Sequence, residues 1–144
     1  MSIVKKILIA DDEPDILEII QFNLQKEGYE VATAKNGDEA IEQATTFKPD
    51  LIILDVMMPG KSGIDVCGIL RKQPAFKDTL IIFLSARSDE GTEISGLESG
   101  ADDYLTKPIS PKILISKISA LFRRLNKEEE SSILEIGDLK IDRE

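Results

Sequence analysis

Short apolar runs alternate with amphipathic stretches five times along the chain. The apolar runs predict strands at Lys6–Ala10, Glu30–Ala34, Leu51–Asp55, Leu80–Ser85 and residues 104–106. The first, third and fourth runs are almost continuously apolar, as expected of strands buried on both faces, whereas the second alternates and is expected nearer an edge. This alternation of strands and helices predicts an α/β fold, in which five helices cover both faces of a five-stranded parallel sheet.

Capping residues and helical spacing indicate where the five helices lie. Pro14 suits a first helical turn, and Gly28 ends the apolar spacing that follows it. Asn36 and Glu39 resemble a capping box at the start of the second helix. The other three helices are expected at residues 62–72, 89–99 and 111–125.

The character of the chain changes after Leu125. Residues 126–132, NKEEESS, have the composition of a polar, charged linker. The last segment, ILEIGDLKIDRE, has two short apolar stretches around Gly137, which we interpret as the opening strands of another domain. We therefore expect one complete domain at residues 1–125, followed by a linker and a fragment at residues 126–144.

Composition narrows the kinds of chemistry that this chain can perform. The 144 residues include no histidine, which excludes Ser-His catalysis, histidine metal sites and an internal phosphohistidine. The net charge of -9 argues against direct binding to nucleic acid. A single cysteine, Cys67, and the lack of any apolar stretch near the roughly 18 residues of a membrane span lead us to expect a cytoplasmic protein with no membrane contact.

Polar side chains end or directly follow four of the predicted strands, at the sheet edge where parallel α/β folds bind ligands. They are Asp11, Asp12, Asp55, Ser85 and Lys107. Taken singly, each aspartate has an alternative role as a helix cap, and the serine and lysine are ordinary turn and surface residues. Together, three carboxylates at one edge repel one another unless a cation is present, which suggests Mg²⁺. A neighbouring lysine suits a phosphoryl oxygen.

Four motifs resemble, in order and spacing, those of the receiver domains of response regulators. They are ILIADDEPDI, LIILDVMMPGKSGID, FLSAR and GADDYLTKPIS, and the resemblance covers about residues 3–125. It implies the flavodoxin-like strand order 2-1-3-4-5. It also implies that Asp55 accepts a phosphoryl group from the phosphohistidine of a sensor histidine kinase.

The resemblance also implies roles for the residues around Asp55. Asp12, Asp55 and the backbone carbonyl of Met57 are expected to bind Mg²⁺, while Asp11 acts through water. Lys107, preceding a cis proline, is expected to pair with a phosphoryl oxygen. Ser85 would hydrogen-bond the phosphoryl group, and its movement would let Tyr104 change rotamer.

The tail resembles the start of the winged-helix DNA-binding domain of OmpR/PhoB-type regulators. This resemblance implies a transcription factor whose DNA-binding half is absent, so that DNA would be contacted only through that half. It also implies a homodimer of the activated form, made by the fourth helix, fifth strand and fifth helix. The expected contact residues are Ile94, Leu97, Asp102, Asp103, Lys117 and Arg124. Glu93 and Ile113 stand where this type usually has an oppositely charged pair, and Ser95 and Ser119 are neutral where charge is common. We therefore expect weak association.

Two alternatives remain open. A phosphatase of the haloacid dehalogenase type also forms an aspartyl phosphate, but such enzymes have a second aspartate two residues after the nucleophile, where this chain has Met57. A stand-alone receiver, acting only through protein contacts, is the other. We expect a signalling switch that participates in its own phosphorylation and is not an enzyme that turns over external substrates.

Overall fold

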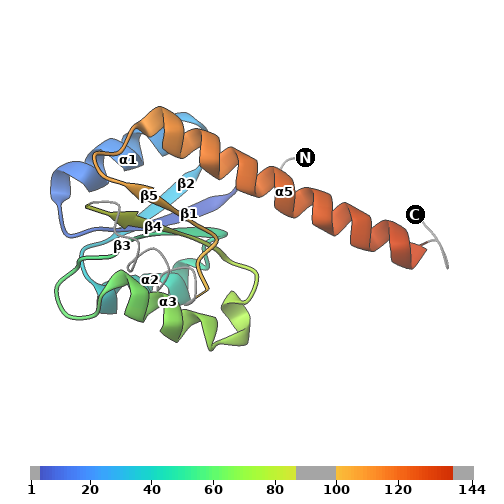
Figure 1. Cartoon of the computed structure of the whole chain (residues 1–144), viewed down its shortest axis with the longest axis horizontal. Helices are drawn as coiled ribbons and strands as arrows, with labels where there is room; N and C mark the ends of the chain where they lie inside the picture. The colour runs from blue at the N-terminus through green and yellow to red at the C-terminus, as the bar shows by residue number, and fades with distance from the viewer. Residues whose placement is uncertain (1–3, 87–99, 138–144) are drawn as a thin grey trace. The chain divides into compact units, whose positions relative to one another are not determined.

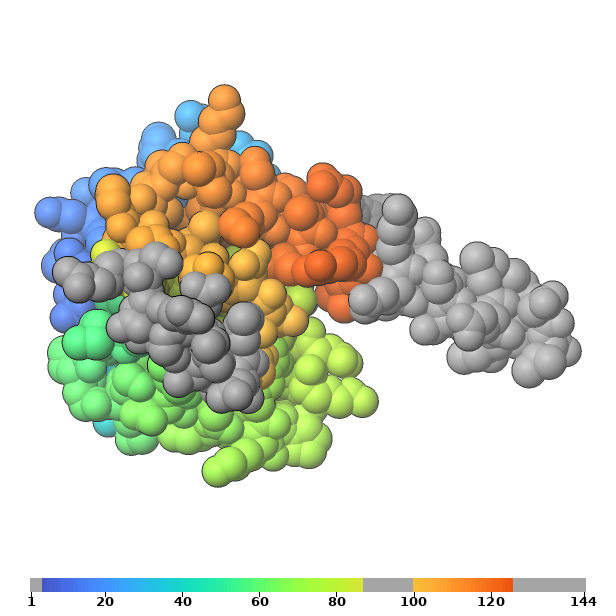
Figure 2. Space-filling model, viewed as in Figure 1, coloured from blue at the N-terminus to red at the C-terminus, as the bar shows by residue number. Residues whose placement is uncertain are grey.

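The computed structural model describes residues 4–86 and 100–137, with side chains as far as Leu125 (coloured in Figure 1 and Figure 2). The chain forms two compact units, Met1–Pro111 and Lys112–Glu144, and each is described by itself. The helix predicted at residues 89–99 lies outside the described residues, as do the predicted contact residues Ile94 and Leu97.

The first unit contains a five-stranded parallel sheet with the order β2-β1-β3-β4-β5. The strands are β1 (Lys6–Ala10), β2 (Glu30–Ala34), β3 (Leu51–Asp55), β4 (Leu80–Ser85) and β5 (Asp103–Thr106). The predicted fold class and strand order are therefore confirmed, including an edge position for the alternating strand β2. The one difference in strand bounds is that β5 begins one residue earlier than predicted, at Asp103.

Helices cover both faces of this sheet. They are α1 (Pro14–Lys26), α2 (Gly37–Phe47), α3 (Gly63–Arg71) and the short 3-10 helix η1 (Pro74–Phe76). Figure 1 shows α1 on one face, with α2 and α3 on the other. Right-handed crossovers between parallel strands place helices on both faces when the strand order reverses, as it does here at β1.

Alternate strand residues face the two helical layers. Those in the core cluster with α2 and α3 are Leu8, Ala10, Ile52, Leu54, Ile81 and Phe83. The residues between them, such as Ile7, Ile9 and Ile53, are also fully buried and must face the opposite layer, because side chains alternate along a strand. Asp11 and Asp55 follow Ile9 and Ile53 by two positions. Their side chains therefore emerge on the same side of the sheet, at its carboxyl edge.

The starts of α2 and α3 are capped by side chains, though not both as predicted. Asn36 accepts a hydrogen bond from the Glu39 N–H (2.8 Å), but the Glu39 carboxylate accepts from the Lys35 N–H and not from the cap residue. The predicted capping box is thus only half formed. A reciprocal box occurs instead between Ser62 and Asp65, at the start of α3 and close after the β3 terminus.

The described part of the second unit is helical: α5 (Pro111–Gly137) begins at the last residue of the first unit and extends past the predicted end at Leu125. Leu114, Ile118 and Leu121 are buried and lie on one helical face, as predicted. The expectation of strands from Ile133 was wrong for residues 133–137. Glu, Lys and Leu are good helix formers, so a charged segment can continue a helix that has already been nucleated. No helix in residues 4–86 or 100–137 is long and apolar enough to cross a membrane.

Candidate phosphoacceptor site

Four carboxylates meet at the carboxyl edge of the sheet. Atoms of Asp11, Asp12, Glu13 and Asp55 all lie within 4.8 Å of one another. Asp55 ends the central strand β3 and is 2% exposed, while Asp11 directly follows β1 and is fully buried. Asp12 and Glu13 are exposed. The three aspartates predicted from the strand ends are therefore brought together, and Glu13 joins them.

The Lys107 ammonium lies among these carboxylates. Its Nζ is 2.9 Å from Glu13 Oε2, 3.1 Å from Asp11 Oδ2 and 3.2 Å from Asp55 Oδ2. The Lys107–Pro108 peptide bond is cis, as the resemblance implied. One ammonium balances only one of the four negative charges, so the site keeps a strong attraction for a further cation.

The pKa values of two groups in the site, Asp55 and Lys107, are raised above their ordinary values. Burial, followed by repulsion from Asp11, raises the pKa of Asp55 from 3.8 to about 6, although Lys107 opposes the rise. The pKa of Lys107 is raised as well. Burial alone would lower it, but the hydrogen bond to Glu13, the close contact with Asp11 and the charges of Asp55 and Asp11 outweigh that effect. Lys107 is therefore held in its charged form.

An unsatisfied atom supports the presence of a cation site. Asp11 Oδ2 is buried and accepts no hydrogen bond from the described residues, although Lys107 lies within ion-pair distance. A buried carboxylate oxygen is costly to leave without a hydrogen bond. Hard divalent cations prefer oxygen ligands of this kind, so the residues present fit Mg²⁺.

The loop after β3 packs its backbone against Asp55. The Met57 N–H donates to Asp55 Oδ1 (3.2 Å), while the Met57 side chain is 71% exposed. The Gly63 N–H donates to the Val56 carbonyl (3.0 Å), and a Cβ added at Gly63 would collide with the Asp55 carbonyl oxygen. Gly63 therefore allows α3 to begin against the backbone of the candidate phosphoacceptor.

Ser85 lies on β4, the strand next to β3, and Tyr104 lies on β5, the strand beyond β4. Asp55 pairs in register with Leu84, so Ser85 is one position further along β4. The Lys107 N–H donates to the Ser85 carbonyl (2.6 Å), which links the chain at Lys107 to the end of β4. Tyr104 is opposite Phe83 and packs, half-buried, against the core on the side of α2 and α3.

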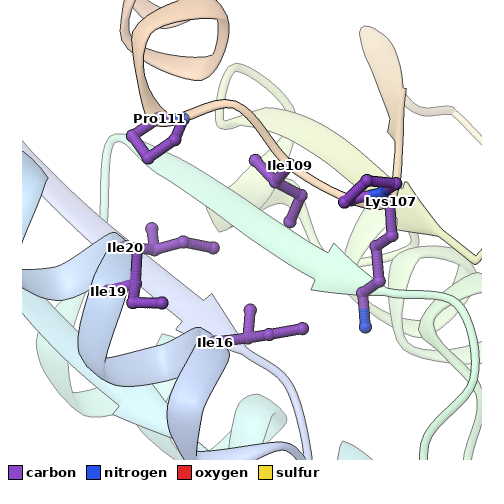
Figure 3. A pocket seen from close by; sticks show the side chains of 7 residues that line it. Ile16, Ile19, Ile20, Lys107, Ile109 and Pro111 are labelled. Atoms are coloured by element: carbon purple, nitrogen blue, oxygen red, sulfur yellow. The ribbon is translucent and has the colours of Figure 1, made fainter.

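An apolar pocket of about 210 Å³ adjoins the site. It is lined by Ile16, Ile19, Ile20, Lys107, Pro108, Ile109 and Pro111. Figure 3 shows the isoleucines of α1 facing Ile109 and Pro111, while the Lys107 side chain extends away toward the end of a strand. The aliphatic part of Lys107 therefore lines the pocket and its ammonium reaches the carboxylates.

Asp102, one of the predicted dimer contacts, has partners within its own unit. Its Oδ2 accepts from the Ile81 N–H (2.9 Å) and from Arg71 Nη2 (3.1 Å). Arg71 also donates to the carbonyls of Gly100 (2.9 Å) and Phe76 (2.6 Å). We call this set the Arg71 clamp. It joins the end of α3 to the beginnings of β4 and β5.

The other predicted contact residues differ in exposure. Asp103 accepts a hydrogen bond from the N–H of Tyr104 (2.8 Å). Lys117 is half-buried and Arg124 is exposed, both on α5. These positions do not test the predicted interface, which stays a prediction.

Sequence reasoning missed Glu13 and Arg71. A signal for Glu13 was present, since the acidic run after β1 has three members, and the third also follows the strand end closely. Arg71 had no such signal, because it is 31 residues from Asp102 and belongs to no recognisable motif.

Comparison with known families agrees with this geometry. Residues 7–119 match the family described as "Response regulator receiver domain". The chain belongs to this family. The match contains every described residue of the carboxylate cluster, Lys107 and the whole of the parallel sheet except Lys6.

The relatives with similar sequences include proteins that are named as transcriptional regulators. The receiver is 46% identical to the "Alkaline phosphatase synthesis transcriptional regulatory protein PhoP" of Bacillus subtilis, over 95% of this chain and 60% of that protein. It is 42% identical to the "Phosphate regulon transcriptional regulatory protein PhoB" of Rhizobium meliloti, over 96% of this chain and 61% of that protein. The chain therefore spans about three fifths of the length of these relatives.

Solved receiver structures have the same fold. A Francisella response regulator receiver domain is 40% identical with a TM-score of 0.77, covering 84% of this chain and 98% of that one. The chemotaxis response regulator CheY4 of Vibrio cholerae is 33% identical with a TM-score of 0.78, covering 82% of this chain and 98% of that one.

Proposed function

We propose that Asp55 accepts a phosphoryl group from the phosphohistidine of a sensor histidine kinase. The observation that carries this proposal is the setting of Asp55. It is the buried carboxylate at the end of the central strand, 3.2 Å from the Lys107 ammonium and inside a cluster of four acidic side chains. Phosphoryl transfer depends mainly on positioning and charge neutralisation, which such a setting supplies.

The transfer itself requires little covalent help from the protein. An Asp55 carboxylate oxygen forms a bond to phosphorus, while the bond from phosphorus to the donor's imidazole nitrogen breaks. The electron pair of the broken bond stays on that nitrogen, which the solvent or donor protonates. With a pKa of about 6, Asp55 is mainly ionised at neutral pH and can act as the nucleophile. Lys107 provides positive charge for a phosphoryl oxygen.

Asp12, Asp55 and the Met57 carbonyl would hold Mg²⁺, with Asp11 acting through water. Bound Mg²⁺ would supply charge neutralisation for the carboxylates and for the phosphoryl oxygens. Asp11 fits this role because its Oδ2 is buried without a hydrogen bond.

Ser85 and Tyr104 would report the phosphorylated state. The Ser85 hydroxyl would donate a hydrogen bond to a phosphoryl oxygen. The movement of Ser85 would let Tyr104 change rotamer. Their positions support this route, because Ser85 on β4 lies next to the strand of the phosphoacceptor and Tyr104 lies on the edge strand β5 beyond it.

Incubation with acetyl phosphate and Mg²⁺ tests the acceptor assignment. The wild-type chain should gain the mass of one phosphoryl group, measured on the intact protein. Asp55→Asn should gain none, whereas Asp15→Asn, which removes an exposed carboxylate from the first turn of α1, should behave like wild type. Phosphorylation of Asp55→Asn would refute the assignment. Turnover of a phosphomonoester would instead indicate an enzyme and not a switch.

We further propose that the receiver controls transcription as part of a longer regulator. The names of its relatives and the fraction of their length that it spans support this. Activation would favour a twofold dimer through residues Ile94, Leu97, Asp102, Asp103, Lys117 and Arg124, with DNA bound only by the effector domain. Because exposed ion pairs contribute only about 0–1 kcal/mol each, and Asp102 already pairs with Arg71, we expect weak association.

Light scattering of the Mg²⁺–beryllofluoride complex tests the dimer. The activated wild-type receiver should show a concentration-dependent rise in mass that Leu97→Asp abolishes. An activated protein that stays monomeric at high concentration, or a dimer unaffected by this substitution, would refute the proposed surface.

A further inference from the structure

Glu13 occupies the N-cap position of α1 but does not cap the helix. Its side chain accepts no hydrogen bond from the first turn, and glutamate is not among the preferred N-cap residues. Instead, Oε2 makes the shortest contact of the three between Lys107 and a carboxylate, at 2.9 Å. The backbone of Glu13 also contributes, since its N–H donates to Asp11 Oδ1 (2.9 Å). The Glu13 side chain therefore pairs with Lys107 and makes no capping hydrogen bond to the first turn of α1.

The Lys107 ammonium is already surrounded by carboxylate oxygens. It donates to Glu13 Oε2 and Asp55 Oδ2, and Asp11 Oδ2 lies 3.1 Å away without a hydrogen bond. A phosphoryl group on Asp55 adds negative charge and strong acceptor oxygens beside the same ammonium. Because Asp55 itself carries the group, the new phosphoryl oxygens compete with Glu13 and Asp11 for the ammonium.

Burial determines which carboxylate can withdraw from Lys107. Asp11 and Asp55 are almost completely buried and cannot turn into water without moving the strand ends, whereas the Glu13 side chain is 58% exposed. Glu13 can leave Lys107 by a side-chain rotation and be hydrated at once. Until it leaves, it neutralises the charge that would otherwise attract the phosphoryl group.

We propose that Glu13 is a positioning residue that holds Lys107 in the unphosphorylated site and competes with the phosphoryl group for it. This inference rests on the proposed function of Asp55 and deepens it, because Glu13 would set how tightly the site retains a phosphoryl group. Half-exposed ion pairs are weak, so the competition should amount to a factor of about three to five.

Beryllofluoride binding at saturating Mg²⁺, measured by ¹⁹F NMR, provides the first test. Glu13→Gln should bind this phosphoryl analogue about three- to fivefold more tightly than wild type. Asp15→Asn removes one charge from the same helical turn without touching Lys107, and should leave the affinity within twofold. Equal gains in both variants would indicate a general charge effect and overturn the proposal.

The reactivity of Lys107 in EDTA provides a second readout that needs neither metal nor phosphoryl transfer. Reductive methylation of Lys107, quantified by peptide mass spectrometry, should be at least twofold faster in Glu13→Gln and in Glu13→Ala than in wild type. The exposed Lys112 serves as the internal reference for each protein. An unchanged relative rate at Lys107 would overturn the proposal, because Glu13 would then not restrain the ammonium.

These outcomes separate the inference from the function on which it rests. If wild type binds no beryllofluoride, or Asp55→Asn binds it equally well, the phosphoacceptor assignment fails. If wild type binds it and Glu13→Gln shows only weaker Mg²⁺ binding, with an unchanged beryllofluoride affinity at saturating Mg²⁺, Glu13 serves the metal and the proposal is overturned.

Discussion

Neutralising Asp55 should stabilise the metal-free receiver, by an amount that grows as the pH rises. The pKa of Asp55 is raised from 3.8 to about 6 in the folded protein, by burial and then by Asp11. The folded state therefore holds this proton more tightly than the unfolded chain does. The resulting stability is fully present below about pH 3.8 and is lost as the pH rises through about 6.

The size of the effect follows from the same pKa values. Each pH unit of difference corresponds to about 1.36 kcal/mol, so a rise from 3.8 to about 6 corresponds to about 3 kcal/mol. The Asp55→Asn variant does not titrate at this position. Its free energy of unfolding minus that of wild type should increase by about 3 kcal/mol between about pH 3 and about pH 7.5.

Urea denaturation in EDTA, followed by circular dichroism because the chain has no tryptophan, measures this difference. The Asp15→Asn variant is the control for loss of a solvated carboxylate. A difference between Asp55→Asn and wild type that is independent of pH would refute the electrostatic reasoning. So would a difference that falls as the pH rises, since it would mean that Lys107 outweighs burial and Asp11.

Three further outcomes are expected. Mg²⁺ at about 100 times its dissociation constant should stabilise the wild-type receiver by about 2.7 kcal/mol, and Asp12→Ala should remove most of this gain; an equal thermal shift in both proteins would contradict the metal assignment. Met57→Asn should shorten the half-life of the phosphorylated protein, because an exposed thioether cannot orient an attacking water and an amide can; an unchanged half-life would contradict this. Gly63→Ala should lower the unfolding free energy by about 1–3 kcal/mol, because its Cβ meets the Asp55 carbonyl, whereas Gly68→Ala meets nothing and should not destabilise; equal effects in urea denaturation would contradict this.

The sheet could be predicted because its strands carry a strong and local signal. Leu51–Asp55 is fully buried on both faces, and a continuous apolar run is the direct consequence of that burial. The grouping of Asp11, Asp55 and Lys107 followed from a single rule, that parallel strands end at one edge. The same rule could not place Glu13, whose contact depends on how α1 begins after the strand and on the rotamer of Lys107.

Other features depend on contacts that no local pattern reveals. Arg71 and Asp102 meet because α3, η1 and the chain before β5 converge, which is a property of the tertiary fold and not of either segment. The continuation of α5 to Gly137 was missed for a different reason. Lysine- and glutamate-rich segments are compatible with both a solvated linker and a helix, and composition alone does not choose between them.

Reductive trapping of the phosphorylated residue tests the central claim most directly. Borohydride converts an aspartyl phosphate into homoserine, which tandem mass spectrometry can locate within a peptide. After incubation with acetyl phosphate and Mg²⁺, homoserine should appear at position 55 alone. Homoserine at Asp11 or Asp12, or a phosphorylated chain with none at position 55, would contradict the identification of Asp55 as the phosphoacceptor.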